Sequence, residues 1–131
     1  MRRVTVAGCL LLLCATGCQP TEQPATVAGT VLMDGQPLTE GEIVFEAADQ
    51  KKAPASGPIL NGKYRLEVLP GLKKVKVRAS RAPSKPDPVM GMAPVESRLG
   101  PEYNESTTLS ADIKAGVNEG VDFQVKELKR K

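Results

Sequence analysis

The chain of 131 residues contains no histidine and no tryptophan, and its only aromatic residues are two phenylalanines and two tyrosines. The missing histidine removes the commonest general base of enzymes and the commonest protein ligand of transition metals. All three cysteines lie within the first eighteen residues, so the rest of the chain has neither a disulfide framework nor a reactive thiol. These absences argue against an enzyme, and we predict no catalytic residue, no metal site and no cofactor.

The only long apolar run lies at the N-terminus. Residues 2 and 3 are arginines, and residues 4–16 form an apolar segment that is too short to span a bilayer. A basic start, a short apolar segment and small residues at its end are typical of a secretory signal peptide. The sequence Ala15-Thr16-Gly17-Cys18 resembles the lipobox of bacterial lipoproteins. That resemblance implies cleavage between Gly17 and Cys18, and acylation of Cys18 by palmitate or a similar fatty acid.

Two alternatives to the lipoprotein stay open. Ala15 and Gly17 also satisfy the small-x-small rule of ordinary signal peptidase, whose cleavage would leave Cys18 as a free thiol, and an uncleaved segment would act as an anchor. We favour the lipid because the exported chain offers Cys18 no disulfide partner, and an orphan thiol would be open to oxidation. Gln19 directly follows the cysteine and favours the outer membrane over the inner one. We therefore expect an exported, membrane-anchored protein of the cell envelope.

The remaining chain has the size of one domain. Removal of residues 1–17 leaves 114 residues, with 16 basic against 15 acidic side chains once the two N-terminal arginines are gone. This near-neutral balance and the predicted export give no support to a nucleic-acid partner. We expect a lipidated cysteine and tether over residues 18–25, one domain over residues 26–128 and a basic tail over residues 129–131. Residues 19–25 reach at most about 23 Å, which keeps the domain near the membrane.

From residue 26 onward, apolar and polar residues alternate with a period of two. Turns such as Asp34-Gly35 and Asn61-Gly62 separate the alternating segments. The expected inward positions are Val27, Gly29 and Val31; Ile43 and Phe45; Tyr64, Leu66 and Val68; Val75, Val77 and Ala79; Leu109, Ala111 and Ile113; and Val121, Phe123 and Val125. No helical periodicity follows the signal peptide. The pattern predicts an all-β chain folded as a single β-sandwich of about seven strands.

Residues 82–107 interrupt this rhythm. The segment holds five prolines, which cannot donate to a strand ladder, and we expect a long crossover loop with room for a brief edge strand. Loops of this length are usually functional or disordered. Its candidate binding residues are Met90 and Met92, whose thioethers suit copper(I), and Tyr103, an aromatic side chain suited to carbohydrate contact. The alternative interpretation is that these side chains pack the loop onto the sandwich.

Lys74, Lys76 and Arg78 share one face of a predicted strand and form a candidate basic surface. A cationic face held near a membrane could meet anionic lipid head groups or cell-wall polymers. The alternative interpretation is a solvated outer face that discourages edge-to-edge pairing of strands.

Several segments resemble carboxypeptidase regulatory-like domains. They are residues 27–38 (VAGTVLMDGQPL) with 41–45 (GEIVF), the hairpin 60–66 (LNGKYRL), and Pro70-Gly71 with 75–77 (VKV). The stretch from residue 101 to residue 123 is similar to small planctomycete-type lipoproteins that carry this domain. The resemblance implies an Ig-like, transthyretin-like sandwich of seven strands. It also implies a non-catalytic accessory module, with no catalytic residue to carry over.

The sequence therefore predicts a lipid-anchored, envelope-facing β-sandwich that acts as a non-enzymatic binding or structural module. Its expected contacts are the membrane, through acylated Cys18, and an envelope protein or cell-wall polymer, through the loop or the basic surface. The alternative is a soluble exported carrier of a small ligand or metal, which would need an enclosed pocket. The sequence indicates neither the identity of the partner nor the oligomeric state.

Overall fold

Short strands and one turn of 3-10 helix make up the part of the chain that the computed structural model describes, which is residues 17, 22–81, 89 and 95–129. The longer strands are β1 (Ala25–Met33), β3 (Glu40–Ala47), β4 (Ala55–Leu60), β5 (Lys63–Val68), β6 (Gly71–Arg78) and β9 (Ser110–Ile113). The shorter ones are β2 (Gln36–Pro37), β7 (Ser80–Arg81), β8 (Glu96–Ser97), β10 (Val117–Asn118) and β11 (Phe123–Val125), and the 3-10 helix η1 spans Pro101–Tyr103. The predicted all-β class is confirmed.

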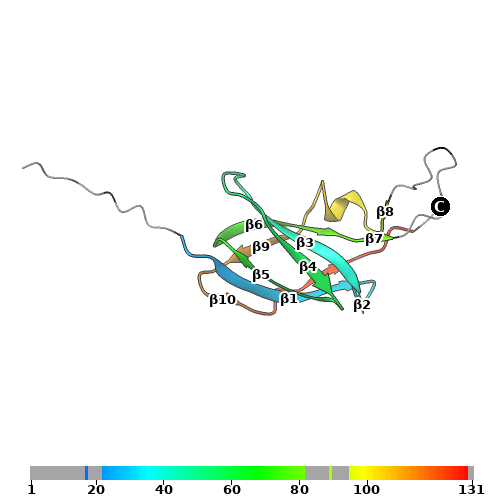
Figure 1. The fold of residues 1–131 in the computed structure, drawn as a ribbon, viewed down its shortest axis with the longest axis horizontal. Helices are drawn as coiled ribbons and strands as arrows, with labels where there is room; N and C mark the ends of the chain where they lie inside the picture. The colour runs from blue at the N-terminus through cyan, green and yellow to red at the C-terminus, as the bar shows by residue number, and fades with distance from the viewer. Residues whose placement is uncertain (1–16, 18–21, 82–88, 90–94, 130–131) are drawn as a thin grey trace, which may run out of the picture.

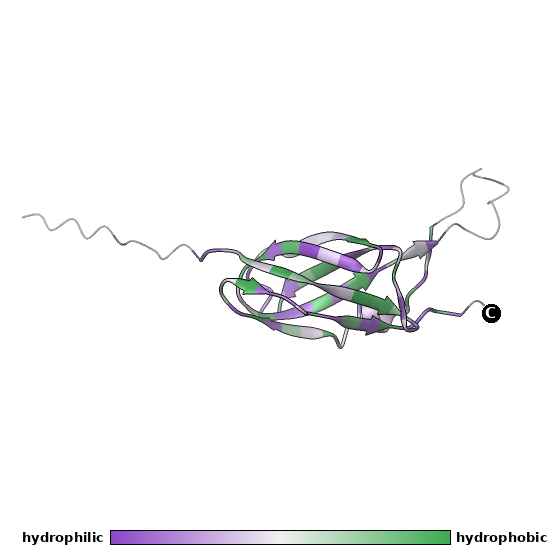
Figure 2. Cartoon of the chain, turned by 90° about the horizontal axis from the view of Figure 1, so that it is seen from below, coloured by the Kyte–Doolittle hydropathy of each residue, from purple (hydrophilic) through white to green (hydrophobic). Residues whose placement is uncertain are grey.

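The main sheet curls over on itself. Its strands follow the order β10-β1-β5-β4-β3-β6-β9 and are antiparallel, except that β10 and β11 run parallel to β1. Within the β4–β5 hairpin, only Leu60 and Lys63 beside the turn are paired, so the ladder is interrupted there. The sheet folds at this hairpin, and Figures 1 and 2 show the resulting sandwich-like arrangement. Seven strands lie along this path, and β2 and β11, which also pair with β1, bring the sheet to nine strands instead of the predicted seven or so.

The predicted inward faces meet in one core. The largest fully buried side chains are Phe45, Leu38, Ile43, Ile59, Ile113, Val27, Val31, Val75 and Val77. The ring of Phe45 lies 6.0 Å from the ring of Tyr64 and 6.4 Å from the ring of Phe123, between ring centroids. Three aromatic side chains thus connect β3, β5 and β11. Truncation of such a buried ring to alanine costs about 3–5 kcal/mol of stability.

Two of the predicted turns have the backbone that their residues favour. Asp34 and Gly35 have φ angles of 51° and 81°, and Asn61 and Gly62 have φ angles of 50° and 77°. Consecutive positive φ values are the mark of the tight hairpin turn that Asp-Gly and Asn-Gly favour. The turn residues therefore set the register of the strands on either side.

Strand β4 was not predicted, because Gly57 and Pro58 weaken the strand signal of its sequence. The structure shows why both are tolerated. Pro58 pairs with β3 on one side, and the other edge of β4 has no ladder partner at that position that would need its missing N–H. A side chain at position 57 would come within 3.3 Å of the Cβ of Leu66 on β5, so glycine lets the layers approach. Strand β1 also begins one residue early, at Ala25, inside the predicted tether.

The strands give the domain two distinct ends. At the end we call the tether end, Ala25 pairs with Val68, and Thr26 pairs with Val117. At the opposite end, here the far end, lie the Asp34-Gly35 turn, the β7–β8 pair and residues 126–129. Figure 1 shows the blue start of β1 at one end of the sandwich and β7 and β8 at the other. No helix in the described part of the chain is long and apolar enough to cross a bilayer.

Candidate functional site

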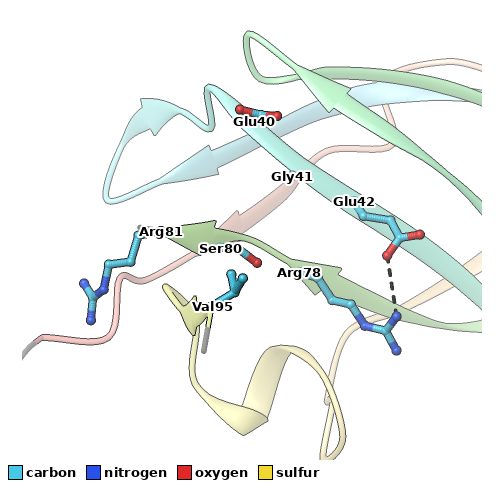
Figure 3. A pocket seen from close by; sticks show the side chains of 7 residues that line it. All are labelled: Glu40, Gly41, Glu42, Arg78, Ser80, Arg81 and Val95. Atoms are coloured by element: carbon cyan, nitrogen blue, oxygen red, sulfur yellow. Dashed lines mark hydrogen bonds and ion pairs between the residues drawn. The ribbon is translucent and has the colours of Figure 1, made fainter. Parts of the chain in front are cut away.

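A hollow of about 520 Å³ lies on the outer surface at the far end, where the predicted long loop leaves and rejoins the sandwich. Figure 3 shows the residues around it, which come from the start of β3, from the end of β6, from β7 and from the segment before β8. Its lining residues are Glu40, Gly41, Glu42, Arg78, Ser80, Arg81 and Val95. Of the predicted candidate residues that the structure describes, Arg78 is the one that lines it.

The register between β3 and β6 builds this hollow. Glu42 stands opposite Arg78 in the antiparallel pair, and beyond Arg78 the chain continues as β7, which pairs with β8. A side chain at Gly41 would come within 2.7 Å of the carbonyl oxygen of Arg78, so only glycine fits the floor without movement of the backbone. Val95 enters at the rim, with 70% of its surface exposed. The hollow therefore combines carboxylates, guanidinium groups and one exposed aliphatic side chain.

The charges around the hollow are partly paired. The guanidinium Nη1 of Arg78 lies 3.5 Å from Oε2 of Glu42, and its Nε donates a hydrogen bond of 3.3 Å to the side-chain oxygen of Asn104. Glu40 is exposed, and it makes no ion pair within the described part of the chain. Half-exposed pairs of this kind are weakly held. These internal contacts can therefore be broken at small cost.

Two arginines and two glutamates fasten the stem of the long loop, and we call this group the arginine clamp: Arg81, Glu96, Arg98 and Glu127. Nε of Arg81 lies 3.3 Å from Oε2 of Glu96, and its Nη1 lies 3.6 Å from Oε1 of Glu127. Nε of Arg98 lies 3.0 Å from the same oxygen of Glu127. The backbone adds a hydrogen bond of 2.7 Å from the amide of Leu128 to the carbonyl of Arg98. The clamp joins the loop stem to the segment after β11 and so holds the rim of the hollow.

The three residues of the candidate basic surface lie on one face, but acidic side chains of β3 neutralise much of their charge. Lys74, Lys76 and Arg78 alternate with buried residues of β6 and lie on its outer face, as predicted. The neighbouring strand places Glu46 beside two of them, since it pairs with Lys74 in register and its Oε2 lies 3.0 Å from Nζ of Lys76. Together with the Glu42–Arg78 pair, this makes a ladder of opposite charges across β3 and β6. The face therefore offers less positive charge than β6 suggests when read alone.

The remaining predicted positions fall into two groups. Cys18, Met90 and Met92 lie outside the described residues, whereas Gly17 is described and exposed. Tyr103 lies in η1, where it is half-buried and packs against the core. This packing agrees with the alternative interpretation of Tyr103, in which the ring fastens the loop to the sandwich. Among the described residues, no group of three or more acidic, cysteine or histidine side chains converges on a possible metal site.

The alternation of residues did not reveal a polar contact in the middle of β1. The hydroxyl of Tyr64 donates a hydrogen bond of 2.5 Å to the carbonyl of Val121, and the amide of Thr30 donates one of 2.8 Å to Oδ1 of Asp122. Burial, with a smaller contribution from the charge of Asp122, raises the pKa of Tyr64 above its ordinary value. We call the hydrogen bond from Tyr64 to Val121 the tyrosine bridge. It lies beside the part of β1 that pairs with neither β10 nor β11.

The burial of Lys73 is a second feature that the alternation of residues did not predict. It faces inward on β6, with only 3% of its surface exposed, although its neighbours on the strand suggest an outer basic stripe. The position is at the tether end, opposite Ala47 and Ala111, whose small side chains leave room for the lysine stem. A long aliphatic stem can be buried while its ammonium reaches the end of the sandwich.

Comparisons with known proteins add no family to this description. A scan against models of protein families finds no match, and a search of curated proteins finds no relative. The resemblance to carboxypeptidase regulatory-like domains stays a prediction from the sequence.

Proposed function

We propose that this protein is a lipid-anchored β-sandwich of the cell envelope, which acts as a non-enzymatic binding or structural module. Acylated Cys18 attaches it to a membrane, with the outer membrane favoured, and the far end makes contact with an envelope protein or cell-wall polymer. The contact surface consists of the hollow at the base of the long loop and the loop itself.

The observation that carries this proposal is the separation of the two ends. The chain enters the sandwich at Ala25, whereas the hollow lies at the far end, beside β7 and β8 (Figure 1). A tether that reaches at most about 23 Å holds the domain next to the membrane. A contact surface at the end opposite the tether is the arrangement that a short-tethered module needs in order to meet a partner.

The shape of the surface favours a module over a soluble carrier. A carrier needs an enclosed pocket that buries most of its ligand. The hollow at the far end is an open depression lined mainly by charged residues. The space between the layers is filled by one cluster of aliphatic and aromatic side chains. A partner with an extended surface suits this geometry better than a small enclosed ligand does.

The proposal is tested by site-specific photo-crosslinking in intact cells. A photoreactive residue at Val95 is compared with the same residue at Glu67, an exposed position of β5 away from the hollow. We expect one discrete protein or polymer adduct from position 95, which weakens when Cys18→Ser releases the protein. Equal, diffuse labelling from both positions would contradict a specific contact at the far end. An N-terminus without acyl mass would return the soluble carrier to first place.

A further inference from the structure

Two aliphatic side chains at the tether end are exposed to solvent. Leu72 and Val117 show 59% and 66% of their surface, near the beginnings of β6 and β10. Single exposed aliphatic residues are common on protein surfaces and need no explanation by themselves. Their position at this end is what makes them informative.

Both residues stand at the starts of strands, next to turns that surround the point where the chain enters the domain at Ala25. The amide of Thr26 donates a hydrogen bond of 2.9 Å to the carbonyl of Gly116, directly before Val117. The amide of Ala48 donates one of 3.2 Å to the carbonyl of Leu72. Gly71 pairs with Ile113, which brings the start of β6 beside the end of β9. The β3–β4, β5–β6 and β9–β10 turns therefore form one end surface around Ala25.

The last described part of the tether lies against this end. An ion pair joins Glu22 to Lys52 in the β3–β4 turn. Four residue steps separate Glu22 from Cys18, and they span at most about 14 Å when fully extended. An acyl chain on Cys18 must lie in the hydrocarbon region, so Glu22 stays within this distance of the head groups. Because the connecting chain is this short, the bilayer is the surface that this end meets.

The charges at this end do not direct it toward one type of lipid. The charged residues near this end balance in number, since four carboxylates (Glu22, Asp49, Glu67 and Asp112) stand against four lysines (Lys51, Lys52, Lys73 and Lys114). Two pairs are in contact: Lys52 with Glu22, and Lys114 with Asp112 at 2.6 Å. A balanced surface gains little from anionic lipid. Contact with the interface would come from the aliphatic side chains, each of which gains when its apolar surface leaves water.

We propose that the tether end rests on the bilayer, with Leu72 and Val117 at the level of the head groups. The inference rests on the proposed acylation of Cys18 and adds an orientation to it. In this orientation the membrane normal runs from the tether end to the far end. The hollow and the loop stem then face away from the membrane, toward the partner.

Single cysteines test this orientation, because the mature chain has no thiol apart from the acylated Cys18. Leu72→Cys and Val117→Cys are compared with Leu60→Cys, a far-end residue of similar exposure at 60%. The acylated full-length mature protein is placed in phosphatidylcholine vesicles and treated with a charged, membrane-impermeant maleimide. The same three variants in the Cys18→Ser background, free in solution, give the reference rates and show that each variant is folded and reactive.

We expect membrane attachment to slow labelling at positions 72 and 117 severalfold and to leave position 60 at its reference rate. The protection should be unchanged when anionic lipid is added. Equal reactivity at all three positions of a protein that carries its acyl mass would overturn the orientation while the anchor stands. Protection at position 60, or protection that requires anionic lipid, would overturn it as well. A protein without acyl mass would overturn both the anchor and the orientation.

Discussion

The two ends of the sandwich differ in their exposed side chains and in how the chain connects the strands. At the tether end, turns with Gly71 and Gly116 close strands, and the surface exposes Leu72 and Val117 among charges that balance in number. At the far end, the strands run on into β7 and β8, and the arginine clamp joins three segments that are distant in the sequence. The first end offers little for a partner to recognise, whereas the second offers a charged hollow on a fixed rim. The contrast matches the two roles that we propose, in which one end rests on the bilayer and the other makes selective contact.

The strand that connects the two ends gives the largest expected effect. A Cβ at Gly29 would stand 1.9 Å from the carbonyl oxygen of Val121, in the middle of β1. We therefore expect Gly29→Ala to lower the free energy of unfolding by about 3 kcal/mol, because backbone must move to make room. Urea denaturation measures the loss. Gly35→Ala is the matched control, since position 35 has open space and costs only the strain of its positive φ. Equal losses for both variants would show that the contact at Gly29 is not tight.

The tyrosine bridge beside Gly29 gives the next effect. Tyr64→Phe keeps the packed ring but removes the hydrogen bond to Val121, and we expect a loss of about 1–2 kcal/mol. The phenol is held neutral in the folded state, because its pKa is raised, whereas the unfolded chain deprotonates near its ordinary pKa of about 10. This contribution is complete below pH 10 and is lost as the pH rises further.

Unfolding measured between pH 8 and pH 11 checks the assignment. The native protein should lose stability above about pH 10, and Tyr64→Phe should lose less over the same range. Tyr103→Phe serves as the control, because Tyr103 is half-buried and its hydroxyl makes no hydrogen bond to any described residue. If the Tyr64→Phe curve fell as steeply as that of the native protein, the alkaline loss would have another origin.

These two regions also show how far the sequence could lead. The alternation of residues such as Val75 and Val77 predicted the inward faces, because a strand turns every second side chain to one side. The same rule placed Lys74, Lys76 and Arg78 on one outer face. It could not show that β3 brings Glu42 and Glu46 opposite them, since the partner of a strand is set by topology and register.

The far end was the least predictable part for the same reason. Arg81, Glu96 and Glu127 are separated by more than a dozen residues from one another, and no local pattern connects them. The clamp appears only when β7, β8 and the residues after β11 have been brought together by the fold. Gly57 and Pro58 hid β4 because local propensity disfavours both in strands, although the tertiary structure accepts them.

Loss of the arginine clamp gives a smaller, local effect. Glu127 accepts both Arg81 and Arg98, so Glu127→Gln weakens two pairs at once. About a third of the glutamate side chain is exposed, and solvent screening limits the loss to about 1 kcal/mol. We expect faster amide hydrogen exchange at Arg98 and Leu128, and unchanged exchange in β1 and β5. Glu119→Gln removes a carboxylate with no ion pair to any described residue and is the control. Uniformly faster exchange across all strands would mean that the clamp supports the whole sandwich and not the rim alone.

The smallest change in stability, and the sharpest test of the outer face, comes from neutralising the acidic partners of β6. Glu42→Gln with Glu46→Gln should cost only about 0.5 kcal/mol, because each pair is at least partly exposed to water. The double variant leaves Lys74, Lys76 and Arg78 uncompensated, and we expect it to bind anionic vesicles more tightly than the native protein at low salt. Glu67→Gln with Glu119→Gln makes the same change in net charge on β5 and after β10, away from this face. If both double variants gained the same affinity, net charge would explain the binding. A gain confined to the first would show that the glutamates of β3 neutralise the basic face of β6.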